Sequence, residues 1–250
     1  MDPIYARYCA YVRSIVQKRD LTNFKRRPSY TYMLEHVSPV LGEKYFNELK
    51  TTFKMSNADI YSFCARNDRI GSPMLASYDG LVVSPSSLRY ICHAALALSH
   101  CRRIGTLNPS FVELGCGYGG LALAIAHYAP MFGVTVKSYT MIDLDEPSAL
   151  QAEYMNNHKV PFPISLQRAS TYGKDVQGTD NFLLSSYCFS EIEPPNQQEY
   201  LRVLFPKCSH GFILWNCCKI FDIGKEITVE PEVPLTCDPN SPNLNYHVYF

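Results

Sequence analysis

Residues 111–120 read Phe-Val-Glu-Leu-Gly-Cys-Gly-Tyr-Gly-Gly, which combines one acid with four glycines. Glycine adopts positive φ angles and lets a ligand approach the backbone closely. The apolar run Leu-Ala-Leu-Ala-Ile-Ala-His follows directly and predicts a helix, whose first turn presents N–H groups without intrahelical partners. A buried strand, a glycine turn and a helix start in this order predict a site for a nucleotide cofactor.

The spacing of these glycines fits two classes of cofactor. Gly115, Gly117 and Gly120 match the G-x-G-x-x-G pattern of dinucleotide sites. Gly115, Gly117 and Gly119 equally match E-x-G-x-G-x-G, the pattern of S-adenosylmethionine sites. The acid of that pattern is Glu113. Only about 130 residues follow the loop, whereas a dinucleotide fold needs a six-stranded sheet and a substrate domain. The presence of Glu113 and the small number of residues after the loop favour an S-adenosylmethionine site over a dinucleotide site.

A second acid, Asp143, closes the next predicted strand, at the end of the run Tyr-Thr-Met-Ile-Asp. A carboxylate at this point can accept hydrogen bonds from the two hydroxyls of a ribose. The alternative role is a helix N-cap ahead of Pro147. Both cofactor classes contain a ribose. Asp143 therefore indicates that a nucleoside binds, but it does not distinguish between the two classes. The motif around it favours ribose binding over capping.

Five segments of the chain, at 66–73, 84–90, 112–120, 142–150 and 186–191, carry a resemblance to a known family. They resemble the sugar O-methyltransferases, which are class I S-adenosylmethionine-dependent methyltransferases found in bacteria and large DNA viruses. The resemblance covers roughly residues 60 to 236. It implies a Rossmann-like methyltransferase sheet and S-adenosyl-L-methionine as the cofactor. It also implies a sugar hydroxyl as the acceptor, in a glycan or in an activated sugar such as a deoxysugar.

The resemblance further implies roles for single residues at the cofactor site. Gly115 and Gly117 would pack against the methionine part and the ribose, and Glu113 would orient the loop or the cofactor's ammonium group. Leu144 would lie against the adenine, and Ser170 near the adenine amine. The full set of expected cofactor contacts is Glu113, Gly115, Cys116, Gly117, Asp143, Leu144, Ser170 and Ser186.

A base that removes the proton of a sugar hydroxyl would add roughly 10²- to 10⁴-fold to the rate of methyl transfer. It should lie near the carboxyl end of the fourth predicted strand, and Glu191 follows that strand. A stabilising charge at a helix N-terminus is an equally weighted role for Glu191. Asp68, Asp79 and His247 are further candidates for the base. Their alternatives are turn chemistry for the two aspartates and sheet packing for the histidine.

Acceptor recognition is expected from the helical N-terminal part, with the loop at 66–84 acting as a lid. Tyrosine offers a flat apolar face and a hydroxyl, which suits sugars. The residues expected near the acceptor, because they lie beside the motifs, are Tyr78, Tyr118, Tyr187 and Arg89. The sequence contains no tight cluster of carboxylates, so no metal ligands are predicted, although dependence on a divalent metal stays open.

The composition narrows the partners and the compartment. The chain has 250 residues, 46% of them hydrophobic, with 23 basic and 23 acidic residues. Zero formal charge without a basic stripe disfavours nucleic acid as a partner. The ten cysteines form no Cys-x-x-Cys pair, and we find neither a signal peptide nor an 18-residue apolar stretch. We therefore expect a reduced, cytoplasmic protein (in the host cytoplasm if it is viral) without membrane insertion.

Two parts of the chain must position these residues. Residues 1–105 show apolar residues at helical spacing and predict a helical N-terminal extension. In residues 106–250 strands and helices alternate, which predicts an α/β methyltransferase domain with a mostly parallel sheet. Strands at 227–233 and 246–250, joined by a loop with two prolines, predict an antiparallel end to that sheet.

The sequence leaves other functions open. They are a methyltransferase that acts on another small molecule or on nucleic acid, a non-catalytic module that binds S-adenosylmethionine, and a nicotinamide oxidoreductase. The intact glycines and Asp143 disfavour loss of cofactor binding, but they do not identify a base. The oligomeric state is not specified.

Overall fold

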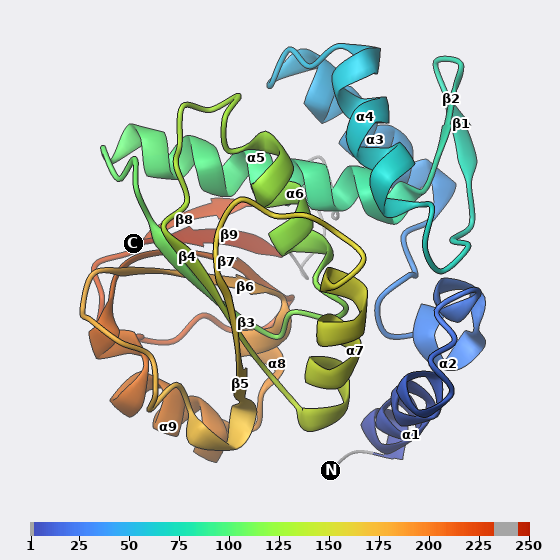
Figure 1. Cartoon of the computed structure of the whole chain (residues 1–250). Helices are drawn as coiled ribbons and strands as arrows, with labels where there is room; N and C mark the ends of the chain where they lie inside the picture. Colours follow the sequence, from blue (N-terminus) through green and yellow to red (C-terminus); the bar gives the residue numbers. More distant parts are fainter. Residues whose placement is uncertain (1–2, 233–244) are drawn as a thin grey trace. The chain divides into compact units, whose positions relative to one another are not determined.

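The computed structural model describes residues 3–232 and 245–250 (Figure 1). The chain divides into two units, each built from three segments. The first unit comprises the residues up to Leu96, Gly117–Tyr128 and Ala149–Val160, and the second comprises Ala97–Cys116, Ala129–Ser148 and Pro161–Phe250. A domain boundary between residues 105 and 106 stays a prediction.

The first unit is largely helical. Its elements are α1 (Pro3–Lys18), η1 (Phe24–Arg26), α2 (Pro28–Thr31), α3 (Pro39–Thr51), α4 (Asn57–Asn67), β1 (Ala76–Tyr78), β2 (Leu81–Val83), most of α5 (Pro85–Arg103), α6 (Gly120–Tyr128) and most of α7 (Asp145–Met155). Side chains cap α3 and α4. The hydroxyl of Ser38 accepts the Leu41 N–H at the start of α3, and Ser56 and Asp59 form a capping box at α4.

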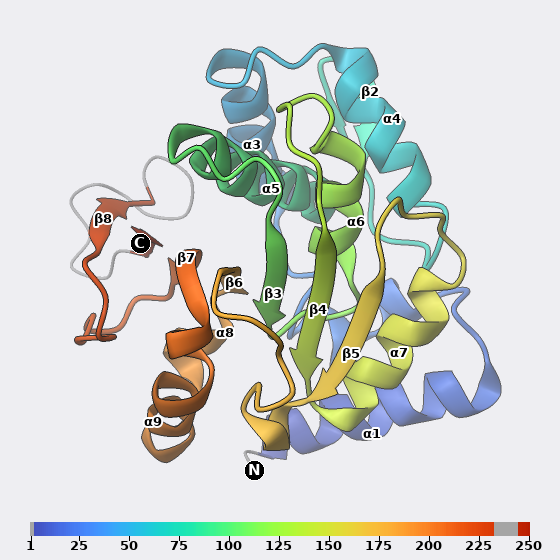
Figure 2. The same cartoon turned by 60° about the vertical axis from the view of Figure 1, so that its left-hand side comes forward.

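The second unit contains a seven-stranded sheet (Figure 2). The strands are β3 (Ser110–Leu114), β4 (Ser138–Asp143), β5 (Ile164–Arg168), β6 (Asn181–Ser186), β7 (Cys208–Trp215), β8 (Thr228–Pro231) and β9 (Tyr246–Tyr249). Their order is β5-β4-β3-β6-β7-β9-β8. The first five in sequence pair in parallel, whereas β9 runs antiparallel to both β7 and β8.

This sheet confirms the predicted α/β fold with a mostly parallel sheet and an antiparallel last strand. The chain places β4 and β5 on one side of β3, and then β6 and β7 on the other side. In open α/β sheets, ligands bind outside the carboxyl ends of the strands at the point where the strand order reverses. That point is the end of β3, directly before the glycine loop. The predicted loop with two prolines falls within 233–244, outside the described residues.

Four short helices complete the second unit: η2 (Ala169–Thr171), α8 (Cys188–Glu191), α9 (Pro194–Val203) and η3 (Phe205–Lys207). Tyr200 of α9 belongs to one buried cluster with Val112, Leu183 and Ile213, which come from three parallel strands. Burial of these apolar side chains holds α9 against the sheet.

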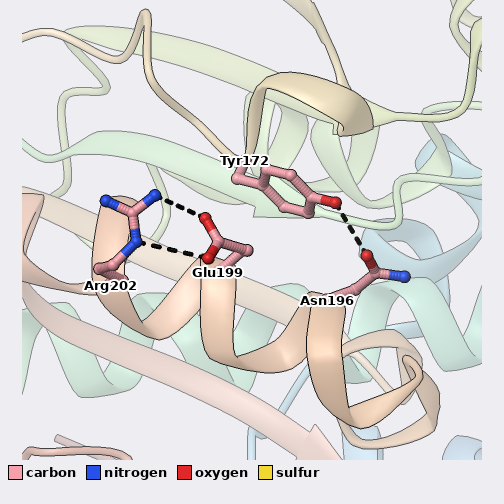
Figure 3. Close-up of polar contacts among 4 residues, drawn as sticks. All are labelled: Tyr172, Asn196, Glu199 and Arg202. Carbon is pink, nitrogen blue, oxygen red and sulfur yellow. Dashed lines mark hydrogen bonds and ion pairs between the residues drawn. The ribbon is translucent and has the colours of Figure 1, made fainter.

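Polar contacts on α9 add local order, as Figure 3 shows. The hydroxyl of Tyr172 donates to Asn196 Oδ1 at 2.8 Å, which ties the turn after η2 to the first turn of α9. Glu199 and Arg202 form an ion pair of 2.6 Å one helical turn apart. Since this pair is exposed to solvent, its contribution to the free energy of unfolding is small.

Two further observations concern the helices and the cysteines of the described residues. No helix in that part of the chain is both long enough and apolar enough to cross a bilayer. The cysteines at positions 9 to 218 are all free thiols, and most of them are buried. A buried free cysteine packs as a small hydrophobic residue.

Candidate functional site

The glycine loop leaves β3 at a position that excludes a side chain. Gly115 has a φ of +75°, in the left-handed region that favours glycine. A Cβ built on Gly115 would collide with the Cβ and Sγ of Cys188, the first residue of α8. The backbone at Gly115 is therefore packed directly against the segment that follows β6. This close approach explains why glycine stands at the first position of the motif.

The carboxylate of Asp143 joins the end of β4 to this loop. The Cys116 N–H donates to Asp143 Oδ2 at 2.8 Å, and the Leu144 N–H donates to Oδ1 at 2.8 Å. Backbone donors thus fix both oxygens of the carboxylate at the carboxyl edge of the sheet. This is the edge where a ribose would present its hydroxyls.

Glu113 has a different environment from Asp143. Its side chain is 2% exposed, and its Oε2 accepts a hydrogen bond of 2.8 Å from the Tyr139 hydroxyl. Burial is the main cause that raises the pKa of Glu113 to about 8, and the nearby charge of Asp143 adds to it. Glu113 is therefore engaged inside the second unit, where it links β3 to β4.

Two further predicted cofactor contacts, Ser186 and Ser170, lie at or after strand ends of the second unit, whereas Gly117 belongs to the first unit. Ser186 ends β6, and Ser170 lies in η2, exposed after β5. Sequence reasoning missed Ser185, whose hydroxyl donates to Leu114 O at 3.1 Å and accepts the Phe189 N–H at 3.0 Å. Ser185 thereby holds β6, β3 and α8 together behind the glycine loop. Its position one residue before Ser186 was the only available signal.

Glu191, the first predicted base, lies at the end of α8 and is exposed. The side-chain amide of Asn216 donates a hydrogen bond to Glu191 Oε1, and the Asn216 N–H donates to Ser190 Oγ at 3.0 Å. The loops that follow β6 and β7 are therefore connected through polar side chains. Asn216 is a second residue that sequence reasoning did not identify.

His247, Tyr187 and Glu232 form a cluster at the carboxyl end of the same sheet. The Tyr187 hydroxyl donates to Glu232 Oε1 at 2.7 Å and lies 3.0 Å from Oε2. The Nε2 of His247 lies 3.9 Å from Glu232 Oε1. Glu232 is 0% exposed and His247 is 7% exposed. Tyr187 has a φ of +64°, and strained backbone of this kind is often found at functional sites. Glu232 carried no motif, so the sequence did not point to it.

Asp68 and Asp79, the other predicted bases, belong to the first unit and have structural partners there. Asp68 accepts the Ser84 N–H at 2.8 Å and the Ser87 hydroxyl at 2.5 Å, so it caps the start of α5. Burial raises the pKa of Asp68. Asp79 and Gly80 form the two-residue turn between β1 and β2, with φ angles of +46° and +80°. The backbone twist of such a turn matches the right-handed twist of the two strands that it joins.

Tyr78, Tyr118 and Arg89 also lie in the first unit, and all three are buried. Burial raises the pKa of Tyr78 to about 12, and its hydroxyl donates to Pro39 O at 3.3 Å. The Tyr118 hydroxyl lies 3.1 Å from the side-chain nitrogen of Asn67. The ammonium of Lys25 lies 4.2 Å from the centre of the Tyr118 ring, a cation–π contact. Tyr118 is therefore a core residue of this unit.

Among the residues that the structure describes, no three His, Cys, Asp or Glu side chains are grouped as metal ligands would be. The candidate site is instead made of backbone amides, carboxylates and one imidazole at the carboxyl edge of the sheet. These groups can bind a nucleoside and accept a proton.

No protein-family model matches the chain, and no curated protein matches it. Among solved structures, the chain is similar to the plantazolicin methyltransferase BpumL, whose complex contains SAH. The identity is 12% and the TM-score 0.45, over 84% of this chain and 95% of that one. It is also similar to CalS10, an amino pentose methyltransferase from Micromonospora echinaspora with SAM bound. Here the identity is 11% and the TM-score 0.40, over 57% of each chain.

A third similar structure is a proposed RNA methyltransferase from Pyrococcus horikoshii. It is 16% identical, with a TM-score of 0.40 over 62% of this chain and 80% of that one. All three TM-scores lie below 0.5, so the fold assignment above rests on the sheet itself.

Proposed function

We propose that this chain is an S-adenosylmethionine-dependent methyltransferase. The observation that carries the proposal is the Asp143 carboxylate, held by the Cys116 and Leu144 amides where β4 meets the glycine loop. A carboxylate at this place, beside the reversal of strand order, is suited to the hydroxyls of the cofactor's ribose. Gly115, with a φ of +75° and the Cys188 side chain packed against it, turns the chain out of β3 directly beside this carboxylate.

At a finer level, we propose that the acceptor is a sugar hydroxyl. The resemblance of the five sequence segments to sugar O-methyltransferases supports this choice. In the reaction, the hydroxyl oxygen attacks the methyl carbon and the carbon–sulfur bond breaks. S-adenosylhomocysteine leaves, and the hydroxyl proton passes to a base. Positioning of the oxygen about 3 Å from the methyl group supplies much of the rate.

The base that best fits the geometry is His247. An imidazole is the most frequent general base in enzymes, and the buried carboxylate of Glu232 lies 3.9 Å from its Nε2. Glu232 can stabilise the imidazolium that forms when the hydroxyl proton is transferred. Glu191, exposed and hydrogen-bonded to Asn216, is the alternative base.

Calorimetric titration with S-adenosylhomocysteine and with NAD tests the cofactor. We expect S-adenosylhomocysteine to bind and NAD not to bind. Asp143→Asn should weaken the binding by about tenfold or more, because a hydrogen bond to a charged group is lost. Asp175→Asn, which changes an exposed aspartate of the same unit, is the matched control. Binding of NAD in place of S-adenosylhomocysteine would refute the proposal.

The acceptor is tested by mass spectrometry after incubation with S-adenosylmethionine. Rhamnose-like glycosides are compared with RNA and with a peptide library. A gain of one methyl group on the glycoside supports the sugar assignment, and methylation of RNA or peptide alone contradicts it.

A further inference from the structure

One imidazole nitrogen of the first unit is shielded from solvent without a hydrogen-bond partner. His158 follows α7 and is 9% exposed, and its Nε2 meets no donor or acceptor among the described residues. Its ring packs on the ring of Tyr154, with the two centroids 4.7 Å apart. Because buried polar atoms in native proteins are nearly always paired, a nitrogen of this kind points to a ligand.

The charges that act on this imidazole are positive. Burial is the main cause that lowers the pKa of His158 to about 4, and the charges of Arg66, Arg69 and Lys25 lower it further. The buried Lys25 has Glu35 as a counter-charge. The two arginines remain as the positive groups that a ligand beside His158 would meet.

The two arginines are held differently. Arg66 Nη2 donates to Lys159 O at 2.5 Å, which fixes the guanidinium beside the residue after His158. Burial and the like charge of Arg69 lower the pKa of Arg66, and the group that opposes them is the Tyr154 phenol rather than a carboxylate. The Arg69 side chain is exposed, and in the described part of the chain it makes no hydrogen bond or ion pair. Arg69 is therefore available to a ligand.

Two guanidinium groups and an imidazole nitrogen are suited to one oxyanion. A guanidinium donates two parallel hydrogen bonds to carboxylate or phosphate oxygens, and an imidazole nitrogen can donate one more. An anion between Arg66 and Arg69 offsets the repulsion of their like charges. A phosphate group brings three strong acceptor oxygens and close to two negative charges, so it can serve all three donor groups at once.

We propose that Arg66, Arg69 and His158 form a binding site for the phosphate group of a small phosphorylated molecule. All three residues belong to the first unit, and none of them is a residue of the proposed cofactor site. The equal numbers of basic and acidic residues in the chain, 23 of each, favour a small molecule over nucleic acid. The unpaired His158 nitrogen then finds its acceptor in the phosphate.

Calorimetry with three probes tests the site: inorganic phosphate, glucose 1-phosphate and glucose. Each probe is titrated into the wild type, Arg69→Gln, His158→Phe and Arg7→Gln. The phenylalanine keeps a ring against Tyr154 and removes the two nitrogens. Arg7 is an exposed arginine of the same unit and serves as the matched control.

We expect both phosphorylated probes to bind the wild type and glucose not to bind. Arg69→Gln and His158→Phe should each weaken the phosphorylated probes by about tenfold, because a hydrogen bond to a charged group is lost. Arg7→Gln should leave these affinities unchanged. Tighter binding of glucose 1-phosphate than of inorganic phosphate supports the site with a sugar phosphate as its ligand, and equal affinities support it with free phosphate.

NMR gives a second readout at the same residue. The imidazole signals of His158, assigned by their loss in His158→Phe, should move when inorganic phosphate is added. Unchanged thermal unfolding shows that a variant is folded. If His158→Phe does not fold, Arg69→Gln still decides the test, since it changes an exposed side chain.

Four outcomes overturn the inference. Neither phosphorylated probe binds, glucose binds as tightly as glucose 1-phosphate, Arg69→Gln weakens binding no more than Arg7→Gln does, or a short RNA binds while both small phosphorylated probes fail. Failure of the wild type to bind S-adenosylhomocysteine would instead overturn the proposed function, and the phosphate site would stand or fall on its own probes.

Discussion

The hydroxyl of Tyr187 is bound to the carboxylate of Glu232, 45 residues later in the chain, at 2.7 and 3.0 Å. One residue follows β6 and the other follows β8, so the contact joins two strand ends at the carboxyl edge of the sheet. The same carboxylate lies 3.9 Å from His247 Nε2. A buried carboxylate at this distance can balance the positive charge that the imidazole acquires when it takes up a proton.

Glu232→Gln should lower kcat by about 10- to 100-fold if Glu232 stabilises the imidazolium of His247. The substitution keeps the shape of the side chain and removes its charge. S-adenosylhomocysteine affinity should stay unchanged, because the cluster does not include the Asp143 site. Steady-state kinetics and calorimetry on the same preparation check both values. Equal losses of turnover and of cofactor affinity would show that Glu232 is only structural.

Glu191→Gln should leave turnover close to the wild-type value, since Glu191 is exposed and hydrogen-bonded to Asn216. Loss of a general base would instead cost roughly 10²- to 10⁴-fold in kcat. His247→Gln, measured beside it, should show that larger loss. If Glu191→Gln shows the large loss in kcat and His247→Gln keeps near wild-type turnover, Glu191 is the base and the role assigned to His247 is wrong.

Glu113 should make the stability of the protein fall with rising pH. Its pKa is about 8 in the fold and 4.5 in the unfolded chain, so between these values the folded state binds more protons. The free energy of unfolding then decreases as pH rises from 4.5 to 8, by at most about 1.4 kcal/mol per pH unit. Glu113→Gln removes this dependence. Urea denaturation of both proteins at pH 5.5 and pH 8 measures it, and parallel changes in the two proteins would contradict the assignment.

Gly115→Ala should destabilise the protein more than Gly178→Ala. The two glycines have φ angles of +75° and +74°, so the left-handed backbone costs each alanine about 1–2 kcal/mol. Only at Gly115 does the new Cβ also meet Cys188, whereas the space around Gly178 is open. Chemical denaturation gives the difference in the free energy of unfolding. Calorimetry should show that Gly115→Ala alone loses S-adenosylhomocysteine. Equal destabilisation would show that the contact with Cys188 relaxes at no cost.

The sequence by itself determined the glycine loop, the acid at the end of the next strand and the parallel sheet with its antiparallel end. These features are local or periodic. Glycine spacing, strand alternation and an acid at a strand end can be read within a few residues of the chain.

The tertiary structure alone decided what surrounds each charged side chain. Asp68 and Glu191 are both candidate bases by sequence, yet Asp68 is half-buried and accepts the Ser84 N–H before α5, whereas Glu191 is exposed. Glu232 carried no motif, and it became a candidate only through its neighbours in space, Tyr187 and His247. The physical reason is that desolvation and hydrogen-bond partners come from residues tens of positions away. A short sequence pattern does not contain that information.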